Sequence, residues 1–353
     1  MSVGKFNDIF VAGAGCIGQV LAISLLKSNP FNRVFLITKP AYIKEIQNEG
    51  ITTKGIVEGL FTPNANFLVT DKVDDNFFAK NNITKNPIIF STTKANDVVS
   101  SLLPFQNLAN IAEPSIVCLQ NGLGTEREVL KCLPGNKGLV LKGSVLGAVQ
   151  KKNTALFAYR GKLLIEDCNK NTSSNLLEIF SGQKYGIFDL EMSKNIYRDI
   201  YPKIAVNCVC NPLTIIFNEP IGFLINHCKP LIKSICQEVY AVALSQNIAL
   251  PSAQYLTNFV INTLSNPSEH YFYSSMYDDH VAGKKTEIDY INGSIARIAR
   301  ENGVNTPINE LLTKSIKEIT EMRAKVNSSE EFYQIHDLYL KSLVKKLREL
   351  QSY

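Results

Sequence analysis

Three polar side chains recur every four residues within the apolar segment 203–217. If this segment is a helix, Lys203, Asn207 and Asn211 stack on one of its faces. An amine and two amides are costly to bury without hydrogen bonds, and the residues on both flanks are apolar. An ammonium group can stabilise charge that develops on an oxygen and then give up a proton. The spacing therefore predicts a functional stripe lining a cleft; the alternative is a stripe that faces solvent or caps a neighbouring helix.

A second polar group lies in the segment 274–293, which contains Ser275 and Glu287. Four isoleucines between 288 and 298 predict the buried face of a helix that ends before Gly303. Ser275 and Glu287 lie off that apolar face. On its own, Glu287 is more typical of a carboxylate in a first helical turn, where it interacts favourably with the helix dipole.

The N-terminal segment 6–26 predicts a strand, a glycine turn and a helix. The apolar run 9–12 is typical of a buried strand, and helical spacing begins near Val20. Between them, Gly13 allows a tight turn, Gly15 lets the backbone approach a pyrophosphate, and Gly18 packs the helix against the strand. The helix N-terminus can then bind phosphate. The segment predicts a nucleotide site; a methyltransferase loop or a turn without ligand are the alternatives.

The second predicted strand, 33–39, favours NADPH over NADH. NAD-binding domains carry an Asp or Glu about 20 residues beyond the glycines, where it binds the ribose. This strand ends instead in Lys39, whose cation would attract a 2′-phosphate. The absent carboxylate also counts against a methyltransferase, while a solvated surface lysine is the simpler alternative.

The next two predicted strands of the sheet, 87–94 and 115–120, lead into polar residues. Ligands of open parallel sheets lie beyond the carboxyl ends of the strands, which is where Lys94 and Asn121 are expected. Gly122 and Gly124 indicate backbone close to a ligand, although Asn-Gly is also a common turn pair.

The pattern changes near residue 194. Further strands are predicted at 139–150, 154–167 and 187–190, with a helix at 176–185, whereas nearly all later segments have helical spacing. We therefore expect an α/β Rossmann domain over residues 1–194 and an all-α domain over residues 195–353.

Composition limits the classes of function. Of the 353 residues, 45% are hydrophobic and 20% charged, as in soluble globular proteins. A net charge of +5, spread along the chain, does not favour nucleic acid as a partner. We expect no membrane span, since no apolar run approaches the roughly 18 residues required. The eight cysteines form no CxxC pair, which indicates reduced thiols in a cytoplasmic protein and no metal site.

Together these motifs resemble those of the ketopantoate reductase (2-dehydropantoate 2-reductase) family. The matching segments are GAGCIG at 13–18, TTKA at 92–95, QNGLGTE at 120–126, KIAVNCVCNPLT at 203–214, and the stretch from SSM at 274 to TEIDYING ending at 293. They follow the family order and cover most of the chain, apart from a variable segment around 45–85 and an extension after about residue 327.

The resemblance implies a Rossmann domain followed by a helical domain of the 6-phosphogluconate dehydrogenase C-terminal type, with the active site in the cleft between them. NADPH would deliver a hydride to C2 of a 2-oxo acid. Lys203 would be the general acid, and Glu287 would contact the cofactor side or orient Lys203 and the substrate. The substrate would be held by Asn121, Asn207, Asn211 and Ser275. The cofactor would contact Gly13, Ala14, Gly15, Cys16, Ile17, Gly18, Lys39, Lys94, Asn121, Ala148 and Glu287.

One residue departs from the pattern that the resemblance implies. Bacterial enzymes of this type place a substrate-binding Asn ten residues beyond the position of Asn211 (221 − 211), where this chain has Ile221. A missing amide leaves hydride transfer in place but weakens the substrate assignment, so a reductase of another 2-oxo acid is an alternative. A non-catalytic NADPH-binding sensor is another, against which the intact set around Lys203 argues.

The C-terminal extension predicts a basic amphipathic helix. Leu338, Leu343 and Leu347 form its apolar side, and four cations between 341 and 348 its basic side. We expect it to pack on the second domain or on a second subunit rather than to bind nucleic acid. The resemblance leaves a monomer or a homodimer open.

Overall fold

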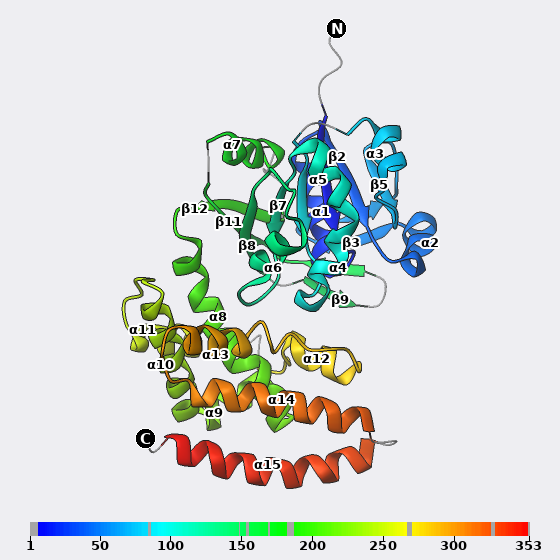
Figure 1. The fold of residues 1–353 in the computed structure, drawn as a ribbon. Helices are drawn as coiled ribbons and strands as arrows, with labels where there is room; N and C mark the ends of the chain where they lie inside the picture. The colour runs from blue at the N-terminus through cyan, green and yellow to red at the C-terminus, as the bar shows by residue number, and fades with distance from the viewer. Residues whose placement is uncertain are drawn as a thin grey trace. The chain divides into compact units, whose positions relative to one another are not determined.

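A computed structural model of the chain describes residues 6–83, 86–147, 149–152, 155–168, 170–181, 187–266, 270–325 and 329–351. Two compact units divide the chain: residues 1–120 with 125–196, and residues 121–124 with 197–353. The first is an α/β unit and the second is helical, as the sequence predicted. Figure 1 follows the elements from the blue N-terminus to the red C-terminus. The four residues 121–124 belong to the helical unit, although the chain on both sides of them belongs to the α/β unit.

The α/β unit is built on an eight-stranded sheet of order β12-β11-β8-β7-β6-β1-β2-β5. All neighbouring strands are parallel except β8 and β11, which are antiparallel. The strands are β1 (Asn7–Ala12), β2 (Asn32–Ile37), β5 (Phe67–Thr70), β6 (Ile88–Ser91), β7 (Ser115–Cys118), β8 (Val140–Leu146), β11 (Gly161–Glu166) and β12 (Phe188–Ser193). The predicted first strand and the parallel Rossmann-type sheet are confirmed.

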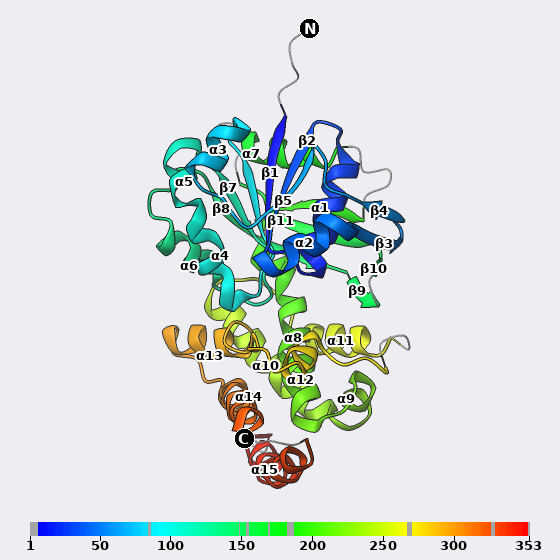
Figure 2. The same ribbon diagram turned by 90° about the vertical axis from the view of Figure 1, so that its right-hand side faces the viewer.

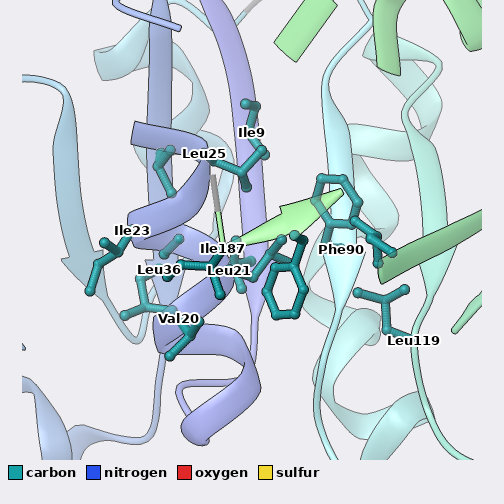
Figure 3. Close-up of a cluster of buried hydrophobic side chains, with 14 of the residues drawn as sticks. Ile9, Val20, Leu21, Ile23, Leu25, Leu36, Phe90, Leu119 and Ile187 are labelled. Carbon is teal, nitrogen blue, oxygen red and sulfur yellow. The ribbon is translucent and has the colours of Figure 1, made fainter. Parts of the chain in front are cut away.

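Alternation along β1 divides the core of this unit between the two faces of the sheet. Ile9 (Figure 3) and Val11 pack against apolar residues of the first set of helices, and Phe10 and Ala12 pack against those of the second. The first set is α1 (Cys16–Ser28) and α7 (Lys170–Ile179). The second set is α3 (Asp75–Asn81), α4 (Val98–Leu102), α5 (Gln106–Ala112) and α6 (Thr125–Cys132), with the 3-10 turns η1 (Ala95–Asp97) and η2 (Leu103–Phe105). Figure 2 shows α1 and the second set on opposite sides of β1.

A smaller four-stranded sheet corrects two strand predictions. The predicted strands 139–150 and 154–167 are each divided between the two sheets, because the chain leaves the large sheet at Gly147 and re-enters it at Gly161. Gly147 has φ +153°, and a Cβ on Gly161 would lie 2.5 Å from the carbonyl oxygen of Leu146. Tyr159 lies between strands and is exposed. The small sheet has the order β4-β3-β10-β9, from β3 (Ile51–Gly55), β4 (Gly59–Phe61), β9 (Val149–Lys152) and β10 (Ala155–Ala158).

The α/β unit also contains α2 (Pro40–Glu49), which follows β2 and has a proline at its first position. The helix predicted at 176–185 is wrong in its bounds, because α7 begins at Lys170 and ends at Ile179. Leu176 and Ile179 are buried against the sheet, so packing of these two side chains sustains a helix whose first turns are rich in Ser, Thr and Asn.

The helical unit is organised around α8 (Ile196–Phe217), which carries the polar stripe. The remaining helices are α9 (Ile221–His227), α10 (Lys229–Ser245), α11 (Ala253–Leu264), α12 (Ser275–Val281), α13 (Asn292–Glu301), α14 (Pro307–Lys325) and α15 (Ser329–Gln351). By length and composition α8 could cross a membrane, which corrects the expectation that no such stretch exists. However, 78% of its apolar window is buried inside the protein, as in the core helix of a globular unit.

The C-terminal extension forms α15, which packs against α14 and α10 (Figure 1). Leu343 and Leu347 are buried, as predicted, whereas Leu338 is 70% exposed. His336 is also buried, and its imidazole is hydrogen-bonded to the backbone of Ile216 near the end of α8. The extension is therefore an integral layer of the helical unit.

Candidate active site

The glycine turn after β1 has the geometry that the sequence predicted. Gly13 has φ +115°, a conformation that few side chains adopt. A Cβ on Gly18 would lie 1.8 Å from the carbonyl oxygen of Gly13, so only glycine allows α1 to begin this close to the strand. Thr92, after β6, donates its hydroxyl to the Gly13 carbonyl at 2.8 Å. The TTKA motif thus supports the turn through a residue that sequence reasoning had not assigned a role.

Gly15 differs from the other two glycines because a Cβ there would meet nothing within 4 Å. It is the N-cap of α1, forms no side-chain cap hydrogen bond, and precedes a first turn without acidic residues. Open space over an uncapped helix N-terminus fits a pyrophosphate group, whose oxygens accept hydrogen bonds from backbone N–H groups. Ala14, Cys16 and Ile17, which complete the turn, are all partly accessible.

The two expected lysines follow strands that flank β1 in the sheet. Lys39 comes two residues after β2 and Lys94 three residues after β6, and both are exposed. Because β6, β1 and β2 are adjacent and parallel, Lys39, Lys94 and the glycine turn all follow the same edge of the sheet. Ala148, the remaining expected cofactor contact of this unit, lies outside the described residues.

The end of β7 is fixed by a buried lysine. Lys142 is 1% exposed, and its Nζ donates to the carbonyl oxygen of Gln120 at 2.9 Å. The side-chain amide of Gln120 donates in turn to the hydroxyl of Ser91 at 2.7 Å. Sequence reasoning gave Lys142 no role, because nothing in the pattern of β8 separates a buried lysine from an exposed one. These bonds hold the residue that immediately precedes Asn121.

Residues 121–124 cross to the helical unit and lie directly against its backbone. The N–H of Leu123 donates to the carbonyl oxygen of Tyr290 at 2.9 Å. Gly122 has φ +80°, and a Cβ on it would lie 1.8 Å from that same oxygen. Gly124 has φ +100°, and a Cβ there would lie 2.8 Å from the Arg297 guanidinium. Close approach to the Tyr290 backbone therefore requires glycine at position 122, and the positive φ favours glycine at position 124.

Lys203 and Asn121 are brought together in this arrangement. The Nζ atom of Lys203 donates to Oδ1 of Asn121 at 3.0 Å, although 82 residues separate them. Lys203 is partly accessible, while Ile204, Ala205 and Cys208 on the flanks of α8 are buried. The ammonium group of the stripe is thus held by an amide of the short segment 121–124.

Asn207 and Asn211 differ in exposure along the same helix. Asn207 is partly accessible, whereas Asn211 is only 4% exposed. The backbone carbonyl of Asn211 lies 3.5 Å from the hydroxyl of Ser274, which also lies 2.7 Å from the hydroxyl of Thr214 on α8. Ser274 is the N-cap of α12 and accepts a hydrogen bond from the N–H of Tyr277. The neighbouring Ser275 is exposed, so the two serines of this motif have different surroundings.

Glu287 is 5% exposed and lies in the turn before α13. Its carbonyl oxygen accepts hydrogen bonds from the N–H groups of Tyr290 and Ile291. The helix predicted from Ile288 onward begins only at Asn292, so Glu287 is not a first-turn carboxylate; its turn is instead held against residues 121–124 through Tyr290. Among the described residues no cluster of three or more His, Cys, Asp or Glu could hold a metal ion.

All eight cysteines are free thiols. Burial raises the pKa of the Cys236 thiol to about 12 and that of Cys228 to about 11. Burial also raises the pKa of Cys208, on α8, well above its ordinary value. These thiols stay protonated at neutral pH and act as apolar core residues.

Comparison with known proteins agrees with the fold and the motifs. The model "Ketopantoate reductase PanE/ApbA" matches residues 9–167, and "Ketopantoate reductase PanE/ApbA C terminal" matches residues 195–320. The 2-dehydropantoate 2-reductase of Shigella flexneri is 27% identical over 317 residues, which cover 88% of this chain and 94% of that protein. The 2-dehydropantoate 2-reductase of Salmonella typhi is 31% identical over 238 residues, which cover 67% and 75%.

A solved structure shares the fold at lower identity. The ternary structure of D-mandelate dehydrogenase with NADH and anilino(oxo)acetate has a TM-score of 0.73 and 23% identity, and the match covers 89% of this chain and 98% of that one. The two family models together cover most of this chain, including all five motifs identified in the sequence. The chain belongs to the ketopantoate reductase family of oxidoreductases.

Proposed function

We propose that this protein reduces ketopantoate (2-dehydropantoate) to pantoate with NADPH, a step of pantothenate biosynthesis. The observation that carries the proposal is the hydrogen bond of 3.0 Å between Lys203 Nζ and Asn121 Oδ1. It joins an ammonium group and an amide from two of the motifs that this family shares. An acid held by a neutral amide keeps its proton available for an oxygen acceptor, which a protein that only binds nucleotide does not need.

In this proposal the α/β unit holds the phosphates of the nucleotide, and Asn121 and Glu287 of the helical unit add further contacts. The uncapped N-terminus of α1 and the open space over Gly15 support a pyrophosphate there. Lys39 binds the 2′-phosphate, and Lys94 contributes a second cation at the same edge of the sheet. The remaining contacts are assigned to Gly13, Ala14, Cys16, Ile17, Gly18, Asn121, Ala148 and Glu287. When bound, NADPH supplies the hydride that reduces the C2 carbonyl.

The helical unit supplies the acid and the substrate contacts. Lys203 stabilises the oxygen on C2 as negative charge develops and then donates a proton to it from Nζ. Asn121 accepts a hydrogen bond from that ammonium group and so restricts its direction. Glu287, which is buried, orients Lys203 and the substrate or contacts the cofactor. The substrate's other oxygens are bound by Asn207, Asn211 and Ser275.

A reductase of another 2-oxo acid is a second candidate, and Ile221 is the observation that favours it. Ile221 is 6% exposed at the start of α9, where the related bacterial enzymes are expected to have a substrate-binding amide. Its N–H donates to the carbonyl of Phe272, two residues before Ser274. An apolar side chain at this position changes which substrate groups are bound without removing the acid.

Turnover assays test the proposal directly. NADPH oxidation is followed by absorbance with ketopantoate and a panel of other 2-oxo acids, for the wild type and for Lys203→Ala. We expect ketopantoate turnover in the wild type and a loss of roughly a thousandfold or more in kcat for the variant, with NADPH affinity nearly unchanged. Turnover of a different 2-oxo acid, without turnover of ketopantoate, would support the mechanism but assign another substrate. NADPH binding without turnover of any acid would favour a sensor and contradict the proposal.

We also propose a cytoplasmic location and a boundary between the two domains near residue 194. Eight free cysteines support the former, because reduced thiols are typical of the cytoplasm. The end of β12 at Ser193, followed directly by α8, supports the latter.

A further inference from the structure

The middle of α8 contains a proline that breaks its hydrogen-bond ladder. Pro212 lies within the helix, directly after Asn211 of the polar stripe. A proline has no N–H, so the carbonyl four residues earlier loses its helical donor. That carbonyl belongs to Cys208, which is completely buried and lies next to Asn207. Without another donor, this buried oxygen would be costly to the folded state.

Asn292 supplies the missing donor. Its Nδ2 lies 2.9 Å from the carbonyl oxygen of Cys208, across 84 residues of sequence, and its side chain is fully buried at the first position of α13. The same Nδ2 lies 2.9 Å from Oδ1 of Asn309 on α14. Two oxygen acceptors at hydrogen-bond distance require a donor between them, so the neighbours fix the orientation of this amide.

A carboxylate on α10 fixes the orientation of the hydrogen-bonded side-chain amides of Asn309 and Asn292. The Nδ2 of Asn309 donates to Oε2 of Glu238 at 2.7 Å, and the N–H groups of Ile308 and Asn309 donate to the two oxygens of Glu238. A carboxylate accepts only, so it turns Oδ1 of Asn309 toward Asn292. Burial raises the pKa of Glu238 above its ordinary value, although its hydrogen bonds with Ile308 and Asn309 act in the opposite direction.

We propose that Asn292 is a positioning residue for the polar stripe of α8. Its amide replaces the N–H that Pro212 withholds, and so fixes the turn of helix between Lys203 and Asn211. The bond ties this turn to α13, whose preceding segment carries Glu287 and lies against residues 121–124. Asn292 touches neither substrate nor cofactor. The inference deepens the proposed function and rests on it, because its main readout is turnover.

A double-mutant cycle with Pro212 tests the inference. Asn292→Leu removes the donor and keeps the branching and the number of heavy atoms of the side chain, whereas Pro212→Ala returns an N–H to Cys208 and makes the Asn292 bond dispensable. We expect Asn292→Leu to lower kcat roughly tenfold to a hundredfold, with KM for NADPH changed less than about threefold. In the Pro212→Ala background, Asn292→Leu should lower kcat by less than about threefold. An equal loss in both backgrounds, or an unchanged kcat in Asn292→Leu, overturns the inference.

Thr257→Val on α11 is the matched control. Thr257 is likewise buried and donates to a helix carbonyl, that of Ala253, and within the described part of the chain its hydroxyl forms no hydrogen bond with α8. Thr257→Val should lower the unfolding midpoint without changing kcat or its pH profile. Asn292→Leu should change the pH profile of kcat, because it displaces Lys203. If Asn292→Leu cannot be purified, recovery of the folded double variant supports the inference, and failure of both contradicts it.

Unfolding measurements separate this inference from the proposed function. If no 2-oxo acid is reduced, the proposed function fails, but the cycle still predicts that Pro212→Ala diminishes the loss of stability caused by Asn292→Leu. Additive effects of the two substitutions on the urea midpoint would then show that Asn292 and Pro212 act independently. That result would contradict the inference whatever the outcome of the turnover assays.

Discussion

At the scale of single residues, Lys39 is expected to decide between the two nicotinamide cofactors. It is exposed just beyond β2, so its ammonium group can reach a phosphate on the ribose without loss of buried contacts. A charge-assisted hydrogen bond to phosphate contributes about 1.5–3 kcal/mol. Lys39→Glu should therefore lower the ratio of NADPH to NADH in kcat/KM by roughly tenfold or more.

Lys44→Glu is the matched control for this prediction. Lys44 is an exposed lysine on α2, and its reversal changes the net charge by the same amount. Steady-state kinetics with both cofactors should show an unchanged ratio in Lys44→Glu. If Lys39→Glu also left the ratio of NADPH to NADH in kcat/KM unchanged, the role assigned to Lys39 would be contradicted.

Ile221 tests the substrate assignment at the same scale. Ile221→Asn introduces an amide where the resemblance implies a substrate contact, and it should raise kcat/KM for ketopantoate relative to the other 2-oxo acids by about tenfold. Ile225→Asn is the control, because Ile225 is 7% exposed on the same helix and its substitution carries a similar burial cost. An equal shift in the two variants, or none in either, would make the departure at Ile221 incidental to specificity.

At the scale of elements, the buried imidazoles of α12 and α15 make the helical unit sensitive to acid. His280 on α12 is 5% exposed, and burial lowers its pKa to about 4, with further contributions from Arg323 and His336. Burial likewise lowers the pKa of His336. Unfolding restores the ordinary pKa, so between about pH 6.5 and pH 4 the unfolded state binds more protons and stability falls as the pH falls.

Urea unfolding between pH 7 and pH 5 measures this effect. The free energy of unfolding should fall by about 1–2 kcal/mol through His280 alone, and His280→Gln should remove that part of the slope. His227→Gln is the control, since His227 is exposed. If the free energy of unfolding depends on pH equally in the wild type and in His280→Gln, the acid sensitivity belongs to other groups.

Local pattern predicted those elements whose determinants lie close together in sequence. Alternation along β1, the glycines of the turn and the four-residue spacing of the stripe on α8 are each contained within about two turns or one strand. The divided strands around Gly147 and Gly161 could not be predicted, because which sheet a strand joins depends on partners distant in sequence. The bounds of α7 failed for the same reason, since packing outweighs the weak propensity of its first turns.

Within the site, sequence reasoning identified the residue types but not the contacts that connect them. The bond from Lys203 to Asn121 spans 82 residues and that from Asn292 to Cys208 spans 84. Lys142 was missed because a single lysine in a strand has no periodic signal. Asn292 was missed because its amide replaces the backbone N–H that a proline on another helix lacks. Such pairs become visible only when the fold brings the two elements together.

At the scale of the whole molecule, each unit has a hydrophobic core of its own, so a change in one core should leave ligand binding by the other unit intact. Leu343→Ala and Leu347→Ala delete buried side chains of α15, which are 2% and 4% exposed. Each should lower the free energy of unfolding of the helical unit by about 2–5 kcal/mol. The affinity for NADPH, whose phosphates we assign to the α/β unit, should change by less than about twofold.

Leu338→Ala on the same helix provides the comparison that makes this prediction specific. Its side chain is 70% exposed, so its removal should change stability by less than about 0.5 kcal/mol. Calorimetry reports the unfolding of the helical unit, and fluorescence titration reports NADPH binding to the same samples. A loss of NADPH affinity in step with stability would mean that the C-terminal layer supports the nucleotide site and that the two units do not act separately. Retained affinity in destabilised variants means that α15, which lies beyond the residues matched by the family models, serves the helical unit alone.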